Sequence, residues 1–119
     1  MIKKLLSSLL AVGFAASSLV FAQAVTQSAS AAGSCPNNNW TNLDDNRVNN
    51  NFANNGVNIR TGDSVDCTSL GQGQKTHDTR LHCWTFNGTW GWNHLRDINT
   101  TVVGWVRDDQ LNVVAVNYC

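Results

Sequence analysis

The chain has 119 residues, and its 8 Lys and Arg residues balance 8 acidic residues, so its formal net charge at pH 7 is zero. This length accommodates one small domain. A charged fraction of 13% without net positive charge argues against a nucleic-acid-binding protein, which needs a basic surface to contact phosphates.

The N-terminal 32 residues have the pattern of a secretory signal peptide. Two lysines precede an apolar stretch over 5–21, and small-residue cleavage patterns follow at 22–24 and 29–31. These patterns favour a cleaved signal over a membrane anchor, which needs about 20 predominantly apolar residues. Cleavage near residue 24 and near residue 32 both remain open. Either removes two of the 8 basic residues, which leaves 6 against 8 Asp and a net charge of −2.

All four cysteines lie beyond this leader, which predicts two disulfides in a secreted, extracellular or wall-associated protein. Three connectivities are possible. We favour Cys67–Cys83 between neighbouring strands and Cys35–Cys119 between the termini. Because the core of so short a chain is marginally stable, we expect the disulfides to decide whether it folds.

Residues 33–55 form an Asn-rich extension before the domain proper at 56–119. Eleven of the sixteen Asn residues of the chain lie at 37–58. We expect an irregular segment, fastened by Cys35, with room for one short strand. The next residues, 56–60, alternate with period two and predict a strand with Val57 and Ile59 inward.

The sequence then predicts a hairpin. After a loop that opens with turn residues at 61–64, a strand is expected over 79–86, with Leu81 and Cys83 on one face and His82 and Trp84 on the other. Asn87-Gly88 predicts a two-residue turn, and the chain returns over 90–96.

The C-terminal part predicts two more strands, over 102–106 and 111–116, with one helical turn at 108–110 between them. Short strands at this spacing, without helix-forming runs, indicate an all-β barrel or sandwich.

Four short motifs follow one another along the chain. Residues 56–62 contain Val-Asn-Ile-Arg-Thr-Gly, residues 70–71 are Leu-Gly, residues 92–95 are Trp-Asn-His-Leu, and residues 104–111 begin with Gly-Trp-Val and end with Leu. In this order they resemble the V-N-[IV]-R-[ST]-G opening, the apolar-Gly step, the W-x-x-[LV] strand and the closing G-W-V-x(4)-L of bacterial Src homology 3 (SH3-like) domains. Trp40-Thr41-Asn42 and His94-Leu95-Arg96-Asp97 further resemble small secreted actinobacterial members. The sequence departs from the pattern at Asp63, where the family has Pro.

The resemblance implies a small SH3-like barrel of five to six strands and a non-catalytic role in binding cell-wall peptidoglycan. Relatives bind peptidoglycan peptides when they are joined to wall hydrolases. No cofactor is expected, and neither nucleic acid nor, after signal cleavage, a membrane is an expected partner. We expect a monomer.

Catalytic and metal sites find little support in the sequence. Residues 66–70 faintly resemble the nucleophile site of cell-wall cysteine peptidases, but Cys67 has a ready disulfide partner and no helix N-terminus to activate it. The spacing of His77, His82 and His94 matches no zinc motif. Asp108-Asp109 lacks the oxygen-rich loop that calcium prefers, so we interpret it as a solvated turn.

Aromatic residues supply the best candidate site. Five crowd into residues 84–105, and alternation along 90–96 puts Trp90, Trp92, His94 and Arg96 opposite Asn93 and Leu95. With Leu95 in the core, Trp92 would face a groove, where Trp side chains bind sugars and extended peptides. The candidate ligand-binding residues are Trp90, Trp92, Trp84, Asp63 and Asp108, the two Asp residues being partners for a cationic ligand group.

Two functions follow. The first is a secreted binding module for peptidoglycan peptide or glycan. The alternative is a secreted interaction factor, inhibitor or toxin-like protein with an extracellular protein target. An enzyme is the least supported reading.

Overall fold

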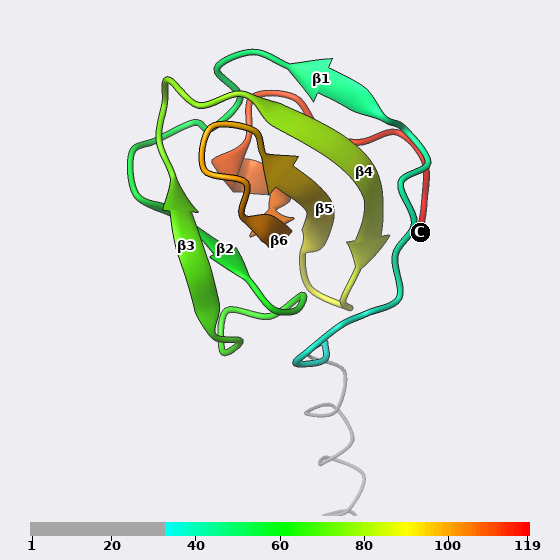
Figure 1. Cartoon of the computed structure of the whole chain (residues 1–119). Helices are drawn as coiled ribbons and strands as arrows, with labels where there is room; N and C mark the ends of the chain where they lie inside the picture. Colours follow the sequence, from blue (N-terminus) through cyan, green and yellow to red (C-terminus); the bar gives the residue numbers. More distant parts are fainter. Residues whose placement is uncertain (1–32) are drawn as a thin grey trace, which may run out of the picture. The chain divides into compact units, whose positions relative to one another are not determined.

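The computed structural model describes residues 33–119, so the predicted signal peptide lies outside the described residues. These residues form one six-stranded antiparallel sheet (Figure 1). Its strands are β1 (Asn46–Val48), β2 (Val57–Arg60), β3 (Ser69–Gly73), β4 (Thr79–Phe86), β5 (Gly91–Asp97) and β6 (Val103–Arg107). A 3-10 turn, η1 (Asp108–Gln110), follows β6. The all-β prediction is confirmed, and no helix over 33–119 is long and apolar enough to cross a membrane.

The strands are ordered β1-β4-β5-β6-β2-β3. The sheet is open, with β1 and β3 as its edges. Most predicted elements are confirmed: β2, β4, β5, β6, the turn at 108–110 and a short strand within the Asn-rich segment. The predicted hairpin also forms, but four residues, 87–90, separate the Phe86–Gly91 pair.

Two segments differ from prediction. Ser69–Gly73 forms β3, although Ser-Leu-Gly-Gln-Gly has little strand propensity, because it pairs along the buried strand β2. Residues 111–116 were expected to form a strand and do not, apart from a single bridge between Phe52 and Leu111. The side chain of Asn51 instead hydrogen-bonds the backbone of this segment. The Val113 N–H donates to the Asn51 Oδ1 (2.7 Å), and the Asn51 Nδ2 donates to the Val113 carbonyl (2.9 Å).

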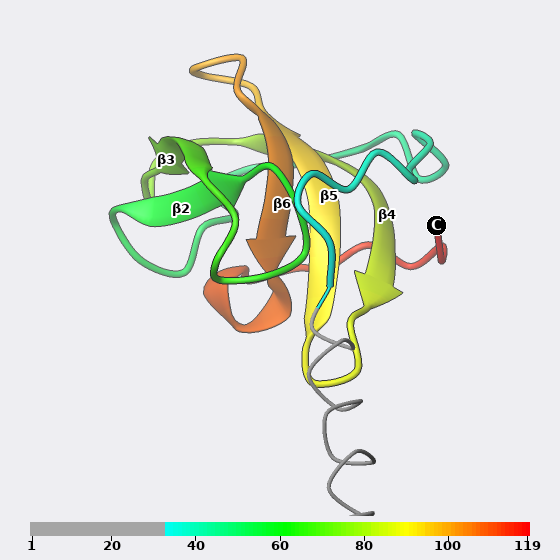
Figure 2. The same cartoon turned by 90° about the horizontal axis from the view of Figure 1, so that it is seen from below.

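Both faces of the central strands are covered. On one face, Leu81, Leu95 and Val106 belong to the main hydrophobic core. On the other, the N-terminal segment crosses β5 and β6 (Figure 2). The Trp105 indole N–H donates to the Asn37 carbonyl at 2.9 Å, and the Trp40 ring stacks on His94. The Asn-rich segment is therefore a structural layer of the domain.

An irregularity in β4 changes which side chains share a face. Leu81 pairs with Leu95, but Cys83 pairs with His94, so the register shifts at His82. The predicted placement of Leu81 with Cys83 is therefore wrong, because one extra residue in β4 inverts the alternation. Trp84 consequently packs against the core.

The disulfides are Cys35–Cys67 and Cys83–Cys119, so the favoured pairing was wrong. Cys67 lies in the loop after β2, and the N-terminal segment runs beside this loop, with the Asn37 N–H donating to the Thr61 carbonyl. Cys119 lies beside β4, since its N–H donates to the Trp84 carbonyl at 2.8 Å. Two disulfides are consistent with an extracellular protein.

Gly73 is expected to be intolerant of any side chain. A Cβ atom at Gly73 would overlap the ring of Phe52, which is buried in the core. Overpacking of this kind costs about 1–3 kcal/mol or more, so Gly73→Ala should lower the free energy of unfolding by at least about 2 kcal/mol in urea denaturation. Gly71→Ala is the matched control in the same strand, because its Cβ would meet only the Val102 side chain at 3.0 Å. Equal losses for both variants would contradict this packing.

Candidate functional site

The two tryptophans of the predicted groove lie in different environments. Trp92 is on the same face of β5 as His94, as the alternation predicts, but only 2% of it is exposed. Its ring therefore offers no open stacking surface, because the second face of the sheet is covered. Trp90 is 44% exposed, and the Arg107 guanidinium lies 4.4 Å from the centroid of its ring.

The other three predicted ligand-binding residues have partners within the fold. The buried Asp63 carboxylate accepts hydrogen bonds from the Ser34 N–H and the Asn37 side chain, both at 3.0 Å. Asp108 accepts from the Asn93 side chain, and burial raises the pKa of Asp108. The Trp84 indole N–H donates to the Val116 carbonyl at 3.3 Å. The structure does not bring the five residues together in one groove, and their role in binding stays a prediction.

Three arginines instead lie in register across three neighbouring strands. Arg47 of β1 pairs with Arg80 of β4, and Arg80 pairs with Arg96 of β5. We call these three residues the arginine row. They line a hollow of about 480 Å³ together with Trp40, Asn42, His82, Ile98 and Val103, and no acidic residue is among its lining residues.

The arginine row concentrates charge in an otherwise acidic domain. Half of the six basic residues outside the predicted signal peptide belong to it. Like charges directly opposite each other destabilise a sheet. Two of the three are neutralised at the edge of the hollow, Arg47 by Asp78 (2.7 Å) and Arg80 by Asp45 (3.0 Å). Arg96 is exposed, and its side chain has no hydrogen bond or ion pair with any residue of 33–119.

A pair of histidines under Trp40 forms one wall beside this row. The Nδ1 atoms of His82 and His94 are 2.8 Å apart, so one proton is shared between them. The Trp40 ring stacks on both imidazoles, with centroids 3.7 Å from His94 and 5.0 Å from His82. Burial, reinforced by neighbouring His82, lowers the pKa of His94 to about 3, and burial also lowers the pKa of His82. Both rings are therefore neutral at pH 7.

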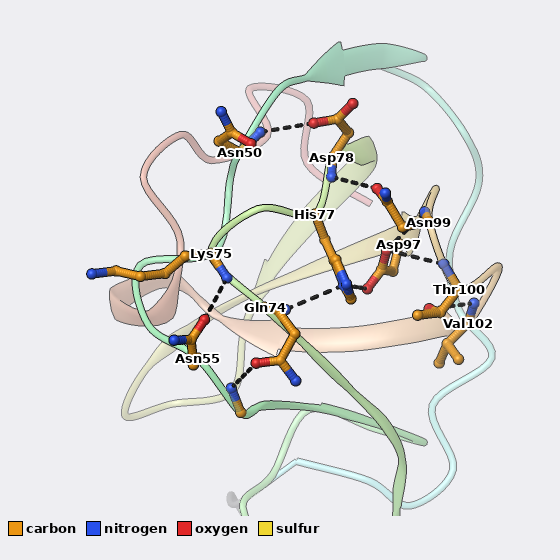
Figure 3. A network of polar contacts seen from close by, with 11 residues as sticks. Asn50, Asn55, Gln74, Lys75, His77, Asp78, Asp97, Asn99, Thr100 and Val102 are labelled. Carbon is orange, nitrogen blue, oxygen red and sulfur yellow. Dashed lines mark hydrogen bonds and ion pairs between the residues drawn. The ribbon is translucent and has the colours of Figure 1, made fainter.

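A second polar cluster joins the loop before β4 to the turn after β5 (Figure 3). Asp97 is fully buried, and its Oδ2 lies 2.7 Å from the Nδ1 of His77. Its Oδ1 accepts from the backbone N–H groups of Asn99 and Thr100. Asp97 thus shapes the turn after β5, and the cluster is structural: its contacts close loops and the ring of Phe52 lies edge-on to His77.

Cysteine and metal chemistry gain no support from the geometry. All four cysteines are in disulfides, which include Cys67. Over residues 33–119, no group of three or more His, Cys, Asp or Glu side chains is placed to hold a metal ion.

Fold and site together define a small disulfide-bonded all-β domain with an arginine-lined hollow on its sheet. Comparisons with protein-family models, curated proteins and solved structures returned no significant match to this chain. The arginine row was not foreseen because it depends on how β1 and β5 pair with β4. Arg47 and Arg96 are 49 positions apart, and no local pattern signals their alignment.

Proposed function

We propose that this chain is a secreted, non-catalytic binding module of the SH3-like type that recognises the anionic peptide part of cell-wall peptidoglycan. The observation that supports this proposal most is the alignment of Arg47, Arg80 and Arg96 across three neighbouring strands. Adjacent strands are about 4.8 Å apart, so the row presents cationic groups over roughly 10 Å. Arg47 and Arg80 are already paired with Asp78 and Asp45, so a ligand carboxylate would pair with Arg96. The rest of an extended ligand would then lie along the other two arginines.

Trp40 supports the same assignment. It is 37% exposed and lines the hollow beside the arginines, with the far side of its ring supported by the histidine pair. A rigid aromatic surface next to cations fits a ligand that alternates apolar or sugar surfaces with carboxylates. The proposed contact surface is therefore the arginine row with Trp40, in place of a groove at Trp90 and Trp92.

Arg96→Gln should weaken binding to purified peptidoglycan sacculi by about tenfold or more, because charge-assisted hydrogen bonds contribute about 1.5–3 kcal/mol. Arg96 is exposed and unpaired, so its replacement should leave the fold unchanged. The measurement is co-sedimentation of the oxidised protein over a range of sacculus concentrations. Lys75→Gln is the matched control, since Lys75 is exposed and lies outside the hollow.

Added salt should weaken the binding of the wild-type protein to sacculi more than the binding of Arg96→Gln, because salt screens exposed charges. Trp90→Ala distinguishes the two surfaces, since Trp90 is about as exposed as Trp40 but lies away from the row. Loss of binding in Trp90→Ala, with full binding in Arg96→Gln, would return the site to the predicted tryptophan groove.

A protein target remains the second candidate, and the C-terminal segment favours it. Four apolar side chains of this segment are 42–78% exposed: Val113, Val114, Val116 and Tyr118. Exposed apolar surface of this kind is typical of protein-protein contacts. Absence of sacculus binding by the wild type, with capture of one extracellular protein that Val116→Ser abolishes, would support this candidate.

A further inference from the structure

A smaller hollow lies at the other end of the covered face of β5. Its volume is about 170 Å³, and its lining includes Trp92, Arg60, Arg107, Asn58, Val65 and Gln110. No lining residue is acidic, and it shares no lining residue with the hollow at the arginine row.

Trp92 is the unusual member of this lining. Its indole Nε1 is the one buried side-chain nitrogen or oxygen over residues 33–119 that lacks a hydrogen-bond partner. Buried donors are almost always satisfied, because an unpaired N–H loses its hydration without compensation. The other buried polar side chains nearby are satisfied; the Asn93 amide, for example, bonds to Asp108 and to the Ala115 N–H.

The two arginines of the hollow are held in place and retain unused donors. Arg60 gives one N–H to the Cys67 carbonyl at 3.0 Å. Arg107 gives two N–H groups to the Asp109 carboxylate, at 2.6 and 2.9 Å, and its guanidinium lies over Trp90. Since a guanidinium has five N–H donors, four remain on Arg60 and three on Arg107. Asp109 offsets one of the two positive charges, which leaves the site net cationic.

We propose that this hollow is a second binding site, which takes a carboxylate group. The volume is enough for a carboxylate with the atoms next to it. One carboxylate oxygen accepts from the Trp92 indole N–H, and the guanidinium groups of Arg60 and Arg107 bind the charge. A peptide C-terminus and a free small organic acid share this chemistry. This inference does not rest on the wall-binding proposal.

The test follows the indole N–H signals of ¹⁵N-labelled, oxidised protein by NMR. The probes are acetylglycylglycine, its C-terminal amide and acetate. We expect a saturable shift of the Trp92 indole signal with acetylglycylglycine and none with the amide. Acetate distinguishes the two sources: a much weaker response than the peptide assigns the site to a peptide C-terminus, and an equal response assigns it to a small acid.

Arg60→Gln and Arg107→Gln should each weaken this response by about tenfold or more. If Arg60→Gln perturbs the fold through its lost bond to Cys67, Arg107→Gln keeps the inference testable, because Arg107 has its other contacts at the surface. Lys75→Gln is the matched control and should respond like the wild type, because Lys75 is exposed and lines neither hollow. An unmoved Trp92 signal, an equal response to the amide, or a response that survives Arg107→Gln would overturn the proposal.

Discussion

Lowering the pH from 7 to 5 is expected to reduce the free energy of unfolding by about 2 kcal/mol through His94 alone. The folded-state pKa of His94 is about 3, against an ordinary value of 6.5. Between these values the unfolded chain binds a proton at this residue and the folded chain does not. The stability that the neutral histidine provides is therefore complete above pH 6.5 and is lost as the pH falls towards 3, for a total of about 4–5 kcal/mol.

Urea denaturation at several pH values between 7 and 5 measures this slope. His94→Gln is the informative variant, because it removes the titrating group while keeping a side chain that can bond to His82. The slope should become distinctly shallower in His94→Gln. Asp108, whose pKa is raised by burial, acts in the opposite direction, and the comparison of the two proteins cancels its contribution. Identical slopes would show that the pKa of His94 is the same in the folded and the unfolded protein, which would contradict this expectation.

Removal of the Cys83–Cys119 disulfide is expected to cost about 4 kcal/mol in a Cys83→Ala/Cys119→Ala double variant. The bond joins residues 36 positions apart, and the chain-entropy relation for such a loop gives about that value. The segment it fastens has no strand of its own, so the disulfide, the buried Leu111 and Ala115 side chains and a few hydrogen bonds hold it. Among these bonds, the N–H groups of Val116 and Asn117 donate to the Asp44 carboxylate.

The free energy of unfolding of this variant at pH 7 tests the expectation. The Cys35→Ala/Cys67→Ala variant is the control, because its loop of 32 positions should contribute almost the same amount. Peptide mapping of the non-reduced protein checks the pairing directly. A peptide that joins Cys67 to Cys83 would contradict the structure.

Local patterns in the sequence predict most of this fold. The alternation of Val57 and Ile59 and the β-rich run over 79–86 correctly give β2 and β4, because each depends on neighbours a few positions away. The disulfide pairing depends instead on how the N-terminal segment crosses the sheet, which no neighbouring residue determines.

The candidate site was harder to predict for the same reason. The prediction that Trp92 and Leu95 lie on opposite faces of β5 was correct. The predicted open groove, however, assumed that only one face of the sheet is buried. Trp40 and Asn37 cover the other face from more than fifty positions away, through contacts with His94 and Trp105. A single extra residue at His82 likewise inverts the faces of β4, and nothing in the composition of the strand announces it.

The two disulfides also divide the chain into successive, non-overlapping covalent rings, 35–67 and 83–119. Only residues 68–82 connect these rings, and this connector includes the exposed Lys75 between β3 and β4. A trypsin-like cut after Lys75 would therefore leave two fragments with no covalent link, each with its own ring. Only non-covalent contacts would then hold the fragments together, among them the pairing of β1 with β4 and of β2 with β6 and the shared hydrophobic core. The nicked protein would therefore behave as a heterodimer that dilution can separate.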